Sequence, residues 1–118
     1  MKVESQLRDG VLRLALVGGD ALDTHSAPLV KLQAQRLIDG GGDVVVDLSC
    51  VEFVDSVGLG VLVGLFKVAR SHGCRTSFVG IRSGVRRVME IIRLDEIFDL
   101  RFDADTRGLL SNPAPRGR

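Results

Sequence analysis

The chain has no tryptophan and no tyrosine, so its only aromatic side chains are five phenylalanines among 118 residues. It also has just three prolines and two cysteines, whereas apolar residues make up 45% of the chain. A core must therefore be built mainly from aliphatic side chains. The length suits one compact domain with a single core, and the sequence shows no internal repeat or domain boundary.

A strong charge of one sign is missing too, because 16 basic and 15 acidic residues leave a net charge of +1. A dedicated nucleic-acid binder normally carries a strong basic patch, so this balance disfavours one. No run approaches the roughly 20 apolar residues of a membrane-spanning helix. Residues 1–6 lack the apolar segment of a secretory signal. We therefore expect a soluble, cytoplasmic protein that binds neither nucleic acid nor membrane.

The two cysteines, Cys50 and Cys74, are expected to be reduced and unpaired. One follows a predicted strand and the other precedes the next strand. If these strands are parallel neighbours, the thiols lie at opposite ends of the sheet, roughly 20 Å apart. The histidines, His25 and His72, also lack the spacing of a metal site. We expect no disulfide, no metal site and no cofactor.

Hydrophobic periodicity predicts an α/β fold with the element order β-β-α-β-α-β-α-β. The expected strands are residues 3–7, 11–17, 43–48, 75–79 and 98–102. The expected helices are residues 24–38, capped by Asp23 or Thr24, then 57–71, and a third that Ser83 caps. A hairpin followed by alternating helices and strands indicates one mixed, mostly parallel sheet of about five strands with packed helices.

Three of these elements carry further expectations about burial. The first helix should bury one stripe of apolar residues. The strand over residues 43–48 is almost wholly apolar, as in a sheet covered on both faces. The helix over residues 57–71 is apolar nearly all round, so it is either fully buried or has an exposed apolar side that could dock a partner. The stripe of the first helix comprises Leu29, Leu32, Ala34 and Leu37.

No enzyme class fits the sequence. The glycines of residues 58–64 resemble a dinucleotide-binding fingerprint, but their spacing is wrong and they lie well past the strand end. A hydrolase elbow needs glycine two residues before its serine, and Val54 occupies that place before Ser56. Asp55 as a receiver-domain phosphoacceptor would need a lysine after a late strand, and none is placed there.

The most informative residue is Ser56, which stands where a helix begins, directly after Asp55. A hydroxyl or carboxylate at this position can simply cap the helix by accepting N–H bonds from the first turn. Free N–H groups and the helix dipole also stabilise a phosphate group at a helix N-terminus. Ser56 is therefore either part of a cap or a hydroxyl at which a phosphate is added and removed.

Residues 47–62, with the motif Asp-Ser-x-Gly-Leu-Gly, closely resemble the phosphorylation-site segment of STAS domains of the anti-sigma factor antagonist type. Residues 22–27 resemble the loop before the first helix of that family. Residues 85–88 and 94–98 resemble its third helix and the approach to its last strand. The resemblance covers residues 5–103 and implies a STAS domain over residues 1–110, followed by a flexible tail, 111–118.

The resemblance implies a partner-switching regulator without catalytic activity of its own. In that family the unphosphorylated antagonist binds an anti-sigma factor that is also a serine kinase, and a sigma factor is released. The kinase then phosphorylates the antagonist, here on Ser56, and a PP2C-type phosphatase restores it. We expect a monomer or weak dimer. The expected partner-binding residues are Asp23, Thr24, Asp55, Val57, Gly58, Leu59, Gly60 and Val61.

A second interpretation stays open. STAS domains also serve as scaffold subunits of stressosomes and lipid-transport complexes, and Ser56 would then be only part of a helix cap. The sequence departs from the family in two places. The loop over residues 19–23 is one residue longer than usual, and Val57 stands where many members have serine or threonine.

Overall fold

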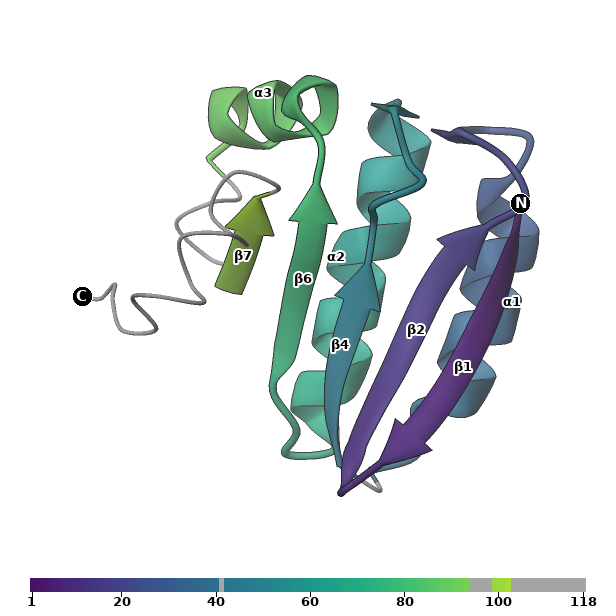
Figure 1. Cartoon of the computed structure of the whole chain (residues 1–118), viewed down its shortest axis with the longest axis vertical. Helices are drawn as coiled ribbons and strands as arrows, with labels where there is room; N and C mark the ends of the chain where they lie inside the picture. Colours follow the sequence, from purple (N-terminus) through teal and green to yellow (C-terminus); the bar gives the residue numbers. More distant parts are fainter. Residues whose placement is uncertain (41, 94–98, 103–118) are drawn as a thin grey trace.

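Five strands form one mixed sheet (Figure 1). The computed structural model describes residues 1–40, 42–93 and 99–102. The strands of this sheet are Lys2–Arg8 (β1), Val11–Val17 (β2), Asp43–Asp47 (β4), Thr76–Ile81 (β6) and Asp99–Phe102 (β7). Their spatial order is β1-β2-β4-β6-β7, and only the β1–β2 pair is antiparallel. The predicted α/β class and mostly parallel sheet are confirmed.

The strands β1 and β2 form the predicted hairpin, with Lys2 opposite Val17 and Arg8 opposite Val11. The two residues between the strands, Asp9 and Gly10, both have positive φ values, 54° and 76°. Two such residues match the right-handed twist of the flanking strands, which is why an Asp-Gly pair favours a two-residue hairpin.

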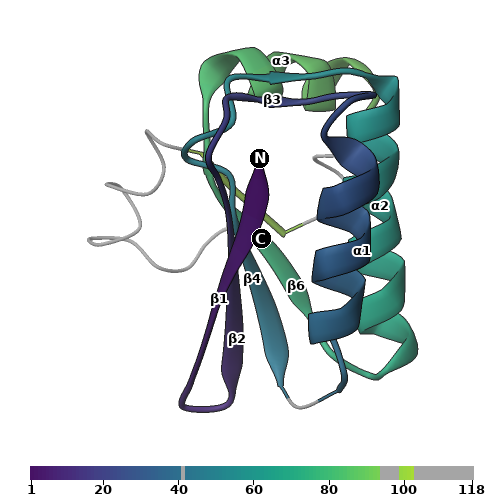
Figure 2. The same ribbon diagram turned by 90° about the vertical axis from the view of Figure 1, so that its right-hand side faces the viewer.

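Two helices, Ala27–Leu37 (α1) and Ser56–Ser71 (α2), pack side by side on one face of the sheet (Figure 2). A third helix, Ser83–Ile91 (α3), lies across the end of the sheet. Within the described residues no helix covers the opposite face, so the expected cover of residues 43–48 is observed on one face only. Val44 and Val46 are buried beneath the helices, whereas Val45, which points the other way, is partly exposed.

The predicted buried stripe of α1 is also wrong in part. Leu29 and Leu32 are each 48% exposed. Ala34 is buried as predicted, together with Ala27 and Val30, at the spacing i, i+3, i+7. Leu37 is partly buried against the core, whereas Leu29 and Leu32 lie on the outer side of the helix.

A separate two-stranded sheet was not predicted. It pairs Ala21–Leu22 (β3) with Phe53–Val54 (β5) in parallel. The carbonyl oxygen of Asp20 also accepts the N–H groups of Glu52 and Phe53, at 2.7 and 3.1 Å. Backbone hydrogen bonds therefore hold the long loop of residues 19–23 against the segment that leads into α2.

The last elements shift slightly from their predicted positions. Arg82, not Ser83, holds the N-cap position of α3, and no side chain caps that helix. The strand β6 extends two residues beyond its predicted end. Phe98, the domain end at residue 110 and the tail over residues 111–118 lie outside the described residues.

One buried polar group lacks a partner, and this generates a stability prediction. Thr76 is 4% exposed, and its hydroxyl makes no hydrogen bond within the described residues. Thr76→Val replaces the hydroxyl with a methyl group and should raise the free energy of unfolding by about 1–3 kcal/mol. Urea unfolding measures the change. Val44→Thr, at the neighbouring register position, should have the opposite effect. A less stable Thr76→Val variant would contradict the prediction.

Candidate functional site

The N-terminus of α2 is held by the side chain of Asp55. This residue has extended backbone angles, φ −105° and ψ −174°, and its Oδ1 accepts the N–H of Gly58 at 2.8 Å. The cap is therefore Asp55 and not Ser56. Ser56 is the first residue of the helix and is exposed, so its side chain is accessible from solvent.

The other carboxylate oxygen of Asp55 reaches across to the loop before α1. It accepts hydrogen bonds from the backbone N–H of Thr24 at 3.0 Å and from the Thr24 hydroxyl at 3.1 Å. The N–H of Gly58, together with these Thr24 donors, holds the pKa of Asp55 below its ordinary value. The carboxylate is thus ionised at neutral pH, directly beside Ser56.

Asp23, the other predicted acidic neighbour of Ser56, faces its own turn. Its Oδ1 accepts the N–H groups of His25 and Ser26, at 3.0 and 3.1 Å. By the assigned bounds of α1, Ser26 holds the N-cap position without a side-chain cap bond, so the helix begins later than predicted. Asp23 nevertheless caps the turn that leads into the helix, because its carbonyl also accepts the N–H of Ala27 at 2.8 Å. This turn presents Thr24 to Asp55.

The two glycines of the motif have different roles. A Cβ atom at Gly58 would overlap the backbone carbonyl of Leu22 in β3, so this position must be glycine for the helix to approach the strand. A Cβ at Gly60 would have no neighbour within 4 Å. Gly58 is therefore required for packing within the domain, whereas Gly60 faces open space.

The remaining predicted partner-binding residues are likewise either buried in the domain or exposed on its surface. Leu59 and Val61 are core residues, 8% and 6% exposed, and they cannot contact a partner without repacking. Val57 is 46% exposed. The sequence analysis missed Phe53, which is 56% exposed just before the motif. We call the exposed residues around the helix start the serine surface; they are Thr24, Phe53, Ser56, Val57 and Gly60.

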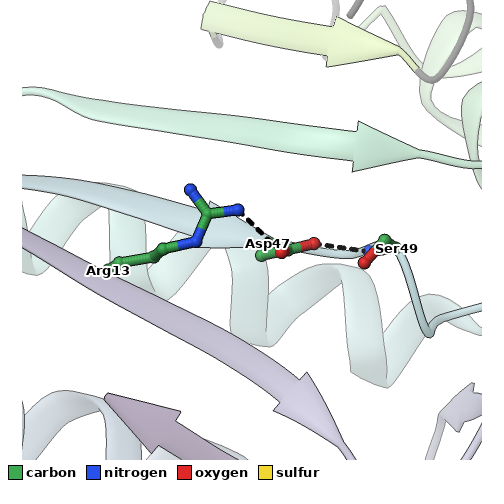
Figure 3. Close-up of polar contacts among 3 residues, drawn as sticks. All are labelled: Arg13, Asp47 and Ser49. Atoms are coloured by element: carbon green, nitrogen blue, oxygen red, sulfur yellow. Dashed lines mark hydrogen bonds and ion pairs between the residues drawn. The ribbon is translucent and has the colours of Figure 1, made fainter. Parts of the chain in front are cut away.

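A polar network anchors the loop that leads from β4 to the serine surface (Figure 3). Asp47 bonds the Arg13 guanidinium at 2.8 Å and accepts the N–H of Ser49 at 2.9 Å. Arg82 donates to the carbonyl of Ser49 at 3.2 Å. Burial raises the pKa of Asp47, but the bonds from Ser49 and Arg13 outweigh it and keep that pKa below its usual value.

Gly80 makes room for this network. Its φ of +68° is strained for other residues, and a Cβ there would lie 3.0 Å from Cβ of Ser49 and 3.1 Å from Oδ1 of Asp47. The network joins β2, β4, the loop after β4 and Arg82, the residue that follows β6. It therefore limits the movement of the backbone on the approach to Ser56.

Other kinds of site are not evident in the described part of the chain. It holds no group of three or more histidine, cysteine, aspartate or glutamate side chains that could bind a metal ion. Both Cys50 and Cys74 are free thiols, as predicted. None of the described helices is both long and apolar enough to cross a bilayer.

Comparisons with known proteins agree on one family. The family model of the STAS domain matches residues 2–107. The anti-sigma-B factor antagonist of Bacillus subtilis (strain 168) is 32% identical over 79 residues, which are 67% of this chain and 72% of that protein. The anti-sigma F factor antagonist of Paenibacillus polymyxa is 27% identical over 111 residues, 92% of each chain.

Solved structures give the same result. The crystal structure of an anti-sigma factor antagonist from Mycobacterium paratuberculosis is similar with a TM-score of 0.73 and 26% sequence identity. The similarity covers 85% of this chain and 84% of the other.

The two motif glycines generate a matched pair of predictions. Gly58→Ala should lower the free energy of unfolding by about 1–3 kcal/mol, because the new methyl group overpacks against Leu22. Gly60→Ala should raise it by up to about 1 kcal/mol, because alanine favours the helix and meets no neighbour. Denaturant unfolding of both variants measures the difference, and equal effects of the two substitutions would contradict the assigned roles.

The lowered pKa of Asp55 generates a prediction about pH. Its hydrogen bonds stabilise the fold fully above the unfolded pKa of about 3.9 and lose that effect as the pH falls through the lower folded pKa. Wild type should therefore be more stable than Asp55→Asn at pH 7, and the difference should shrink below about pH 4. Asp47 titrates in both proteins, so it cancels in the comparison. A difference that does not change with pH would contradict this prediction.

Proposed function

This chain belongs to the STAS-domain family of anti-sigma factor antagonists, and we propose that it binds an anti-sigma factor only while Ser56 is unphosphorylated. Anti-sigma factor antagonists are regulators that are not enzymes, and membership of this family implies binding to an anti-sigma factor. In the proposed cycle that factor is also the serine kinase, and a PP2C-type phosphatase restores the free hydroxyl. We expect the cycle to take place in the cytoplasm, as is typical of this antagonist family.

The observation that carries the proposal is the exposed Ser56 side chain at the first position of α2. Asp55 performs the capping, so the Ser56 hydroxyl is not needed to hold the helix. The segment before Ser56 is held in place by β5 and by the hydrogen bonds of Asp55 to Thr24, and the segment after it by the bond from the N–H of Gly58 to Asp55. A kinase would therefore meet a hydroxyl on a well-defined surface.

The folded domain should tolerate a phosphate at this position. Phosphorylation adds about −1.5 to −2 charges at pH 7, and the positive end of the helix dipole favours negative charge at the first turn. The ionised Asp55 opposes it, but the group is exposed and water screens the repulsion. The phosphate should therefore change the charge of the serine surface without unfolding the domain.

The phosphate should have a larger effect on partner binding than on folding. Phe53 and Val57 are large apolar side chains that are more than 40% exposed on either side of Ser56, so we propose that an apolar surface of the anti-sigma factor covers them. Moving the binding equilibrium from 99:1 in favour of the complex to 1:99 requires a change of about 5.5 kcal/mol in the binding free energy. Leaving one buried charge unpaired costs about 3–5 kcal/mol. Burying a multiply charged phosphate beside Asp55 can therefore cost enough binding free energy to separate the partners.

Within this proposal the members of the serine surface have distinct roles. Ser56 is the phosphoacceptor, and Phe53, Val57 and Gly60 contact the partner. Thr24 lies at the rim, where its hydrogen bonds hold Asp55 in position. The buried Gly58, Leu59 and Val61 support the surface from within.

Substitutions of Ser56 test the proposal. Ser56→Ala should bind the anti-sigma factor constitutively and accept no phosphate, because the hydroxyl is gone. Ser56→Asp should remain folded but bind at least about tenfold more weakly, a difference of about 1.4 kcal/mol. The measurements are titration with a candidate anti-sigma kinase and transfer of radiolabelled phosphate.

A matched control is Ser71→Asp. Ser71 is exposed and is the last residue of α2, so this variant places the same charge on the same helix, roughly 22 Å from Ser56 at about 1.5 Å per residue. It should bind as wild type does. Phosphate transfer that persists in Ser56→Ala, or equal affinities of all the variants, would overturn the proposal.

A further inference from the structure

The strand β1 forms an outer edge of the sheet, since it pairs with β2 alone (Figure 1). In an antiparallel pair, residues that hydrogen-bond to the neighbouring strand alternate with residues whose backbone groups point away. The N–H of Val3 donates to Oε1 of Gln33 on α1, at 2.9 Å. Val3, Ser5 and Leu7 are therefore the residues whose backbone groups face outward.

The outward backbone groups of this edge are hydrogen-bonded at one end only. Gln33 occupies the outward N–H of Val3, but no described residue outside β1 bonds to the outward groups of Ser5 and Leu7. Leu7 is also 66% exposed. An exposed edge of this kind is a template for pairing with another strand.

We propose that two copies of the chain pair antiparallel through β1, about a two-fold axis at Gln6. In this register Ser5 of one copy lies opposite Leu7 of the other, and each such pair exchanges both of its backbone hydrogen bonds. The occupied N–H of Val3 lies opposite the turn residue Asp9 and is not required. The two five-stranded sheets then form one continuous sheet with a symmetric, isologous contact.

Charge complementarity selects this register. It places Glu4 of each copy opposite Arg8 of the other, and opposite charges in direct cross-strand pairs are stabilising. Neither residue takes part in an ion pair within the described residues. An axis at Ser5 would instead oppose Lys2 and Arg8, and an axis at Glu4 would oppose two glutamates. Both alternatives also require the N–H of Val3, which Gln33 already holds.

The packing on the helix side of the edge supports the same register. A crevice of about 280 Å³ opens there between the hairpin and the end of α1; its lining includes Ser5, Leu7, Leu12, Leu37 and Ile38. Because Ser5 lines the crevice and lies opposite Leu7 of the second copy, that exposed leucine would cover its rim. Each copy thus buries an apolar side chain that is otherwise in water.

This contact leaves the serine surface accessible. The helix that contacts β1 is α1, whereas α2 contacts α1, β5 and β6. The inference therefore does not depend on the proposed switch, and a dimer would present two serine surfaces.

Disulfide trapping tests the register. In a background of Cys50→Ser and Cys74→Ala, Gln6→Cys places two cysteines at the axis with Cα atoms about 4.5 Å apart, within the disulfide range of about 4.4–6.8 Å. It should form a covalent dimer under mild oxidation. Glu4→Cys serves as the control, because its two copies would lie roughly 13 Å apart along the strands. Lys67→Cys, exposed on α2, reports random collisions.

Charge reversal provides the second measurement. In the Gln6→Cys protein, Glu4→Arg or Arg8→Glu alone should lower the dimer yield about tenfold or more, and the two together should restore it. Sedimentation of the wild type at millimolar concentration should show reversible dimers. A Gln6→Cys yield no higher than that of Lys67→Cys, or preferential trapping of Glu4→Cys, would overturn the proposal.

Discussion

The site depends on a single carboxylate, that of Asp55. One of its oxygens holds the first turn of α2 through Gly58, and the other holds the loop before α1 through Thr24. Both contacts require the close approach of α2 to β3, which Gly58 permits because it has no side chain to meet Leu22. The position of Ser56 is therefore set jointly by segments about thirty residues apart in the sequence.

Under the proposed function, the same arrangement would let a small domain act as a switch without changing its fold. The Ser56 side chain is not the helix cap, so a phosphate there need not break an internal bond. Its effect falls on whatever covers Phe53 and Val57. The free edge at β1 lies away from α2, so the proposed self-association and the proposed regulation would use separate surfaces.

Much of this was predictable from the sequence. The long strands, the hairpin turn at Asp9 and Gly10, and the helix beginning after Asp55 follow from periodicity and turn chemistry. The burial of α1 was predicted for Ala34 but not for Ala27 and Val30, because Leu29 and Leu32 were chosen by size and not by the phase of the helix. The short pair β3–β5 has too few residues to show a period. The contacts of Asp55 and Asp47 with distant residues depend on tertiary structure.

The central claim is that one phosphate on Ser56 separates the binding and non-binding states. The most direct measurement is calorimetric titration of the cognate anti-sigma factor with two forms of the full chain, unphosphorylated and stoichiometrically phosphorylated on Ser56. The account predicts that both forms remain folded and that phosphorylation weakens binding by a factor on the order of 10⁴ for a complete switch. Equal affinity of the two folded forms would contradict it.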